Sequence, residues 1–159
     1  NDALGGDGPI SPERAGSVPG FPLVEMCFSG QYTKDEINKK LVGKGGAVAY
    51  FGTNDMREIA ARAEAGEEAC ATFLKGFAVS VAKYAGALAT VVGGKVDAIV
   101  LTGGIAHNKA MVEDIKARVG FIAPVEVYAG ENELESLAEN GYGILAGEFD
   151  IKYYHPDHF

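Results

Sequence analysis

The sequence predicts an α/β fold in which parallel strands alternate with helices. From residue 67 to residue 148 the apolar pattern follows the order helix, strand, helix, strand, helix, with short links. A right-handed crossover makes consecutive strands in such an order parallel. The composition, 47% hydrophobic and 23% charged over 159 residues, is that of an ordinary globular domain with a sizeable core.

The first third of the chain is loop-rich and then helical. Residues 1–22 are rich in Gly, Pro, Asp and Ser, which predicts loops and turns, and a short helical turn is expected over 23–28. A helix then begins at Thr33, because Thr33 and Glu36 match a capping box. The Gly-Lys-Gly-Gly segment at 43–46 lacks the spacing and the Ser or Thr of a Walker sequence. We interpret it as a flexible connector.

The stretch GTNDMREI begins the next helix. Thr53 or Asn54 is expected to cap it, which places Asp55 and Arg57 in its first turn. A carboxylate suits that position, since a helix N-terminus carries partial positive charge, and a cation does not. Arg57 therefore indicates an anion outside the helix, or else an ion pair with a glutamate of the same helix.

Residues 67–92 form the longest predicted helix, and its apolar stripe is assigned to the core. The stripe consists of Phe73, Leu74, Phe77, Val81, Tyr84, Ala85 and Leu88. Residues 98–101 are apolar and partly β-branched, which predicts a strand buried on both faces.

Two adjacent glycines, Gly103 and Gly104, follow this strand. Ligands of open α/β sheets bind beyond the carboxyl ends of the strands, and a residue without Cβ lets a ligand approach the backbone. The residues thus suggest a nucleotide at this corner. Glycines that serve only the geometry of the connection are the alternative.

The last part of the chain completes the alternation. Asn108 is expected to cap a helix that ends at Gly120, and residues 124–128 form a second strand. Asn132 and Glu135 form a capping pair for the final helix. Its predicted buried face consists of Leu134, Leu137, Ala138 and Leu145. Because two strands make a poor sheet, we expect the chain to be the second half of a larger α/β domain.

Charge and cysteine content exclude several classes of function. A formal net charge of −8 argues against nucleic acid as partner, because polyanions are bound by clustered Lys and Arg. Cys27 and Cys70 match neither a disulfide framework nor a zinc site, which suits a reducing cytoplasm. Apolar runs of membrane-spanning length are absent from the sequence, and we expect a cytoplasmic protein without a membrane partner.

Arg14 is the first cation of the chain and lies among turn-forming residues, in SPERAG. The fork of an arginine fits carboxylate and phosphate oxygens through two parallel hydrogen bonds. Arg14 is therefore a candidate for binding such a ligand. A solvated surface arginine that pairs with Glu13 or Asp7 is the alternative.

Four stretches resemble, in the same order, the butyrate kinases of the acetokinase family: NDALGGDGPISPERAG, YFGTNDMREI, DAIVLTGGIAHN and FIAPVEVYAGENELESLAENG. The resemblance implies the C-terminal part of a ribonuclease-H-like, actin-like ATPase domain, with few parallel strands and several packed helices. The N-terminal domain is expected to be absent. The single expected domain, 1–159, consists of a substrate-arginine loop (1–22), a helical insertion (23–94), a strand-helix-strand-helix core (95–148) and a tail (149–159).

The resemblance also implies a reaction. Members of this family transfer the γ-phosphoryl group of ATP, with Mg²⁺, to a short-chain carboxylate, and butyrate gives butyryl phosphate reversibly. The implied partners are that carboxylate, the N-terminal domain of the same enzyme and further copies in a homo-oligomer. With half of the cleft absent, the chain is expected to be inactive alone. A non-catalytic actin-like nucleotide-binding module is the alternative.

The matching positions imply a role for each site residue. Arg14 would hold the carboxylate and the migrating phosphoryl group. Glu133, with Glu131 as the second choice, would position Mg²⁺ through water. The implied nucleotide contacts are Asp55 at the ribose, Arg57 on the nucleotide, Gly103, Gly104 and Ile105 against adenine or ribose, and Asn108 near the phosphates.

Overall fold

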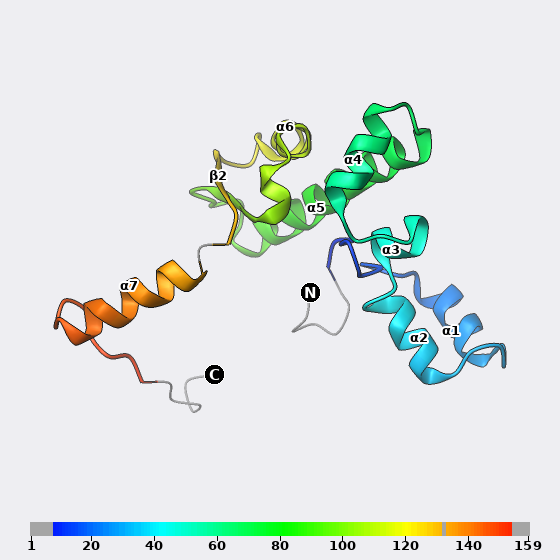
Figure 1. The fold of residues 1–159 in the computed structure, drawn as a ribbon, viewed down its shortest axis with the longest axis horizontal. Coiled ribbons are helices and arrows are strands. Elements are labelled where there is room, and N and C mark those ends of the chain that lie inside the picture. Colours follow the sequence, from blue (N-terminus) through cyan, green and yellow to red (C-terminus); the bar gives the residue numbers. More distant parts are fainter. Residues whose placement is uncertain (1–7, 132, 154–159) are drawn as a thin grey trace.

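The computed structural model describes residues 8–131 and 133–153, and it confirms the predicted α/β class. Within these residues, seven α-helices and a short 3-10 helix accompany a two-stranded parallel sheet (Figure 1). The bounds are α1 Gly20–Phe28, α2 Lys34–Leu41, α3 Gly46–Phe51, α4 Met56–Glu64, α5 Glu68–Val91, β1 Ile99–Gly103, η1 Gly104–His107, α6 Lys109–Val119, β2 Val125–Ala129 and α7 Glu133–Leu145. None of the described helices combines the length and apolar character needed to cross a membrane.

The core forms where α5 packs between α4 and α6. Phe73 and Phe77 of the predicted stripe are buried there, whereas Leu88 is exposed near the end of α5. The buried cluster consists of Ala47, Ile59, Cys70, Phe73, Phe77, Ala78, Met111, Ile115 and Val119. These side chains come from helices α3, α4, α5 and α6, and their burial holds the four helices against one another.

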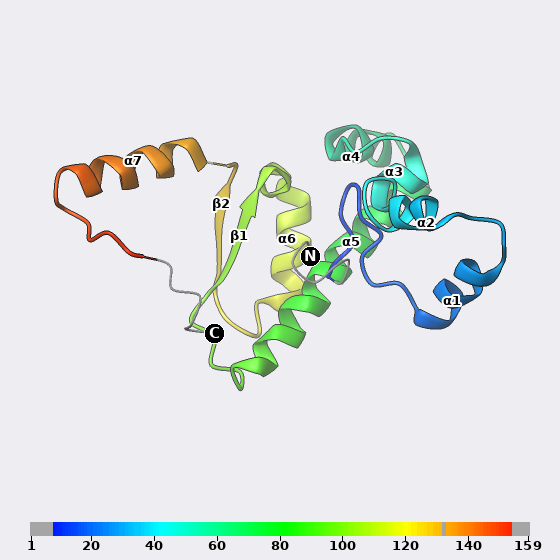
Figure 2. The same ribbon diagram turned by 90° about the horizontal axis from the view of Figure 1, so that it is seen from below.

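The two strands are parallel, as predicted, and pair from Ile99 with Val125 to Gly103 with Ala129. Alternate side chains of β1 point to opposite faces of the sheet. Ile99 packs against the helical core, whereas Val100 is exposed. In the described part of the chain, α5 and α6 cover one face of the sheet (Figure 2). The prediction of a strand buried on both faces is therefore wrong for this structure.

The helices before α4 follow the prediction in part. The capping box of α2 is present, with Thr33 accepting from the backbone of Glu36 and the Glu36 carboxylate accepting from the backbone of Thr33. The backbone N–H and the hydroxyl of Thr33 both donate to the Glu36 carboxylate, and these two hydrogen bonds lower the pKa of Glu36. Helix α1 begins at Gly20, inside the segment predicted to be loop. Helix α3 covers the short apolar segment GAVAYF.

The segment at 43–46 is a packed junction, and its interpretation as a flexible connector is wrong. The backbone N–H groups of Gly43 and Gly45 both donate to the carbonyl of Glu13, at 2.8 and 3.1 Å. Gly45 and Gly46 are buried. A Cβ at Gly45 would lie 2.5 Å from the nitrogen of Ala15, and one at Gly46 would overlap the carbonyl oxygen of Ser11. The partner segment is some 30 residues earlier, so local sequence does not reveal it.

Helix α7 extends away from the body, in both views (Figures 1 and 2). Its predicted buried face is wrong for this structure, because Leu134 and Leu145 are each 84% exposed and Leu137 is also exposed. Within α7, burial is limited to Gly143, against the ring of Phe149. The predicted capping residue Asn132 lies outside the described residues.

Candidate functional site

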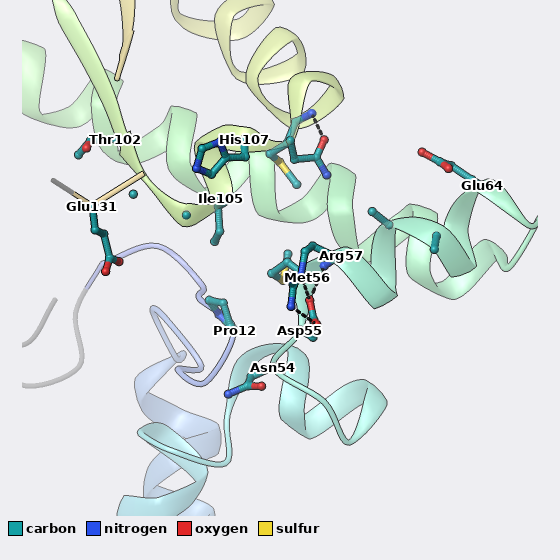
Figure 3. Close-up of a pocket in the computed structure, with 16 residues that line it drawn as sticks. Pro12, Asn54, Asp55, Met56, Arg57, Glu64, Thr102, Ile105, His107 and Glu131 are labelled. Atoms are coloured by element: carbon teal, nitrogen blue, oxygen red, sulfur yellow. Dashed lines mark hydrogen bonds and ion pairs between the residues drawn. The ribbon is translucent and has the colours of Figure 1, made fainter. Parts of the chain in front are cut away.

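A cleft opens between the turn that follows β1 and the first turns of α4 (Figure 3). Its volume is about 1210 Å³. It brings together residues that lie some 50 positions apart in the sequence. The predicted site residues that line it are Asp55, Arg57, Gly103, Gly104, Ile105, Asn108 and Glu131.

The corner formed by Gly103 and Gly104 is open. Gly103 has φ 85° and ψ 174°, a conformation that favours glycine. Its backbone N–H donates to the carbonyl of Gly130 at 3.2 Å, and the N–H of Gly130 donates back at 3.1 Å, so the corner is held in place. A Cβ built on either Gly103 or Gly104 would meet no atom within 4 Å. The space that a Cβ would fill is therefore open at both glycines.

Asn108 caps α6, as predicted. Its side-chain oxygen accepts from the backbone N–H of Met111 at 3.0 Å, and its own N–H donates to the carbonyl of Ile105 at 2.9 Å. These bonds join η1 to α6 and orient the first turn of α6 toward the cleft. The partial positive charge of a helix N-terminus favours anionic groups nearby.

Asp55 and Arg57 form a single ion-paired unit at the start of α4. Asp55, rather than Thr53 or Asn54, caps this helix by accepting from the N–H of Arg57 at 2.9 Å. The guanidinium of Arg57 donates to both carboxylate oxygens of Asp55, at 2.9 and 2.7 Å. This pairing lowers the pKa of Asp55 to about 2. The sequence left two alternatives for Arg57, an anion outside the helix or a glutamate of the same helix. The ion pair within the chain is formed with Asp55 and not with a glutamate.

The remaining surface of Arg57 faces solvent, since its side chain is 92% exposed. In Figure 3 the pair lies across the cleft from Ile105 and His107. The two walls thus differ in character. One is bare backbone with an apolar isoleucine, and the other is a paired carboxylate and guanidinium.

Arg14 lies near the cleft without lining it. The turn from Ser11 to Arg14 is closed by the N–H of Ser11 donating to the carbonyl of Arg14 at 3.1 Å, and Pro12 of that turn lines the cleft. The Glu13 carboxylate accepts from the side chain of Asn54 at 2.6 Å, which ties the turn to the start of α4. The half-buried Arg14 is thereby attached to the cleft wall through its neighbours.

The two candidate metal-facing glutamates lie at the start of the projecting helix. Glu131 lines the cleft and Glu133 does not, and both are exposed. In the described ranges, no group of three or more His, Cys, Asp or Glu could hold a metal ion. A cation at this place would therefore take few protein oxygens and depend on ligand phosphates and water. That mode of binding is typical of Mg²⁺.

Several residues that line the cleft were not predicted to be site residues. They are Pro12, Asn54, Met56, Ala60, Ala61, Glu64, Thr102 and Met111. Most of them adjoin a predicted site residue or lie one helical turn beyond it. Their positions relative to the predicted residues could therefore have identified them from the sequence. His107 also lines the cleft, and a Cβ built on Gly130 would lie 3.3 Å from its Nε2.

The charged lining residues make the cleft acidic at neutral pH. Asp55, Glu64 and Glu131 are set against the single guanidinium of Arg57, which Asp55 already neutralises. A ligand with several phosphate charges would be repelled by these carboxylates. A divalent cation bound together with the ligand would offset that repulsion.

Comparison with known proteins places these features in a family. Residues 12–141 match the model of the acetokinase family. A probable butyrate kinase of Clostridium botulinum (strain Alaska E43 / Type E3) is 50% identical over 154 residues, covering 97% of this chain and 43% of the relative. A probable butyrate kinase of Bacteroides thetaiotaomicron is 47% identical, covering 97% of this chain and 44% of the relative. The chain thus spans less than half the length of these relatives.

Solved structures share the fold. The crystal structure of Porphyromonas gingivalis acetate kinase matches with a TM-score of 0.76 at 22% identity, covering 87% of this chain and 41% of that one. A propionate kinase from Francisella tularensis subsp. tularensis matches with a TM-score of 0.69 at 24% identity, covering 80% of this chain and 39% of that one. At these identities the likeness establishes the fold, which is that of the actin-like ATPases.

Proposed function

The chain belongs to the acetokinase family, and from this premise we propose that it supplies the nucleotide side of the active-site cleft of a carboxylate kinase. The reaction transfers the γ-phosphoryl group of ATP to a short-chain carboxylate, with butyrate as acceptor, and runs in both directions. The observation that carries the proposal is the open corner at Gly103 and Gly104, at the carboxyl end of β1.

The lining of the cleft supports an adenine nucleotide. We assign the base or ribose to the bare backbone of Gly104, which presents no Cβ to a flat ring, and to the adjacent apolar side chain of Ile105. Asp55, held by Arg57, faces the ribose side as a hydrogen-bond acceptor. Asn108 places the N-terminus of α6 at the phosphates.

Mg²⁺ suits the donors on this side of the cleft. We assign Glu133 or Glu131 to hold it through water, since neither forms part of a preassembled ligand cluster among the described residues. When bound, the cation supplies positive charge at the phosphate oxygens, which the acidic lining cannot provide. The sequence leaves both glutamates as candidates.

Arg14 is the proposed catalytic residue. A carboxylate nucleophile is already ionised at neutral pH, so the transfer needs alignment and countercharge rather than a strong general base. A forked guanidinium supplies both, because it can bind the acceptor carboxylate and the equatorial oxygens of the transferred group. Its turn is anchored to the cleft wall through Pro12 and through the Glu13–Asn54 hydrogen bond.

The other side of the cleft is proposed to come from an N-terminal domain of the same enzyme. Two of the apolar surfaces that lack cover among the described residues are the sheet face that carries Val100 and Tyr128 and the leucine face of α7. Glu131 at the cleft leads directly into α7, so a domain that closed the cleft would contact that helix. We expect the 159-residue chain to have no butyrate kinase activity on its own. The free thiols Cys27 and Cys70 suit a cytoplasmic enzyme.

Replacing Arg14 in the full-length protein tests the catalytic assignment. Arg14→Ala is expected to lower the rate of acyl phosphate formation by about 10²-fold or more, as for the loss of a transition-state donor, and to leave the Kd for MgADP unchanged. Arg118→Ala is the matched control, because Arg118 pairs with Asp114 on α6 and does not line the cleft.

Three results would contradict parts of this proposal. Equal losses of binding and transfer in Arg14→Ala would assign Arg14 a structural role. Nucleotide binding without any transfer in the wild-type full-length protein would indicate a non-catalytic nucleotide-binding module. Ordinary turnover by the 159-residue chain alone would show that the N-terminal domain is not needed.

A further inference from the structure

A second hollow lies between helices α2 and α3, which are neighbours in both views (Figures 1 and 2). Its volume is about 640 Å³, which is sufficient for a small molecule. The residues that line it are Tyr32, Glu36, Lys39, Lys40, Lys44, Val48 and Ala49. None of these residues lines the cleft assigned to the nucleotide. The inference below therefore does not rest on the proposed function.

The hollow gathers positive charge on an acidic chain. Three of its lining residues are lysines, and Glu36 is the single acidic one. Over the whole chain, by contrast, Asp and Glu number 22 and Lys and Arg number 14. The nucleotide cleft is acidic and needs a bound cation to accept phosphate groups. The hollow between α2 and α3 instead presents ammonium groups to an anion directly.

This positive charge is not neutralised by the part of the chain that the structure describes. Lys39, Lys40 and Lys44 form no ion pair with a described residue. The Glu36 carboxylate accepts from the backbone N–H and the hydroxyl of Thr33, at 2.8 and 2.9 Å, and so belongs to the cap of α2. The three ammonium groups therefore keep their donors for a ligand.

Two contacts set the positions of the lysines. The backbone N–H of Lys44 donates to the carbonyl of Lys39 at 2.8 Å, which brings Lys44 back toward the end of α2. The Nζ of Lys40 lies 4.8 Å from the ring centre of Tyr32, a cation–π contact that orients this ammonium group. A helix C-terminus favours cations, which accounts for Lys39 and Lys40 in the last turn of α2. It does not account for Lys44, which lies beyond the helix.

The chemistry of the lining favours a small anion with several charges. An ammonium group binds phosphate oxygens as a point charge, without the flat geometry that a guanidinium selects. Val48 and Ala49 add apolar wall and bring no carboxylate to oppose an anion. Nucleic acids and anionic membranes are extended polyanions, which the net charge of −8 on the chain repels. A compact anion meets only the local positive charge.

We propose that the hollow between α2 and α3 binds a compact polyphosphate anion through Lys39, Lys40 and Lys44, without a metal ion. The ligand class is a small soluble molecule that carries more than one phosphate group. A single phosphate reaches fewer of the three ammonium groups and binds more weakly.

Calorimetric titration of inorganic tripolyphosphate into the full-length protein tests the site, with EDTA present so that Mg²⁺ does not bridge the anion to the acidic cleft. Lys39→Gln/Lys44→Gln should raise the Kd for tripolyphosphate by at least about tenfold, through the loss of two charged contacts. Lys83→Gln/Lys95→Gln is the matched control. It removes the same charge from exposed lysines that line neither the hollow nor the cleft, and its Kd should stay near the wild-type value.

The affinity for MgADP should be the same in all three proteins, since none of the replaced lysines lines the cleft. A wild type that does not bind tripolyphosphate would overturn the proposal. Equal Kd values for tripolyphosphate in the two double variants would also overturn it, because the anion would then respond to net charge or bind elsewhere.

Lysine acetylation followed by peptide mass spectrometry gives an independent measurement on the unaltered protein. Saturating tripolyphosphate should slow the acetylation of Lys39, Lys40 and Lys44 relative to that of Lys83 and Lys95, because the bound anion covers the first group only. If tripolyphosphate left the ratio of these rates unchanged, the three lysines would not form a site for it.

Discussion

Two glycine-rich segments of this chain look alike in the sequence and differ in the structure. At 43–46 the last two glycines are packed, and a Cβ at Gly45 or Gly46 would collide with the backbone of the turn at 11–15. At Gly103 and Gly104 a Cβ would meet nothing within 4 Å. Gly45 and Gly46 allow their segment to pack against the turn at 11–15. Gly103 and Gly104 instead leave unobstructed backbone at the end of β1.

The contrast shows how to distinguish a structural glycine from one that serves a ligand. Where the protein itself occupies the space of the missing side chain, the glycine is needed for folding, and its replacement destabilises every state of the protein. Where that space is empty and φ is negative, replacement has little effect on the free energy of unfolding and changes only what can approach from outside. The predictions below test this distinction, from the largest expected change in stability to the smallest.

Gly46→Ala is expected to cause the largest loss. The new methyl group would overlap the carbonyl oxygen of Ser11, and the residue would have to keep φ at +55°. Overpacking and a left-handed backbone together should lower the free energy of unfolding by roughly 2–4 kcal/mol. Urea denaturation followed by circular dichroism measures this change.

Gly43→Ala is the matched control for that variant. Gly43 also has a positive φ, +98°, but a Cβ there has open space. The cost should be limited to backbone strain, about 1 kcal/mol. If the two variants lost equal stability, the packed junction would not explain the role of Gly46.

Local sequence was sufficient where short-range chemistry decides the structure. The Thr33–Glu36 capping box, the Asn108 cap and the parallel pairing of β1 with β2 were all predicted and are present. Each depends on residues within a few positions of one another, or on the crossover rule for consecutive strands. The family and its fold were likewise identified from four short motifs.

Local sequence failed where distant segments meet. It did not reveal that Glu13 receives hydrogen bonds from Gly43 and Gly45, and it therefore treated a rigid junction as a flexible connector. The same limit applies to the site. The Gly103–Gly104 corner was recognised, but its placement opposite the Asp55–Arg57 pair depends on the packing of α4 and α6 against α5. The leucine spacing in α7 predicted a buried face. In the structure that face is exposed, because no described segment packs against it.

Asn108→Ala is expected to cause a moderate loss at the open corner. It removes the oxygen that accepts from Met111 and so exposes an unsatisfied donor at the start of α6. The free energy of unfolding should fall by about 1 kcal/mol, and Asn108→Ser should retain most of it because serine is also a good cap. A loss of stability in the serine variant as large as in the alanine variant would contradict the capping role.

The Asp55–Arg57 pair should give a smaller, pH-dependent effect. Because the folded-state pKa of Asp55 is about 2 and its ordinary value is 3.8, ionised Asp55 favours the folded state. This contribution is complete above about pH 4 and is lost as the pH falls toward 2. Asp55→Asn keeps a capping oxygen but loses the ion pair. The stability difference between wild type and variant should therefore shrink from pH 4 to pH 2, and a difference that stayed constant would contradict the assigned pKa.

The most direct test of the open corner is calorimetric titration of MgADP into Gly104→Val and its control, Gly76→Val. Neither glycine has a positive φ, and a Cβ at either meets no atom within 4 Å, so both variants should unfold within about 0.5 kcal/mol of the wild type. Gly104→Val should raise the Kd for MgADP by at least about tenfold, the equivalent of about 1.4 kcal/mol, and Gly76→Val should leave it unchanged. Unaltered MgADP affinity in a folded Gly104→Val protein would contradict the assignment of this corner to the nucleotide.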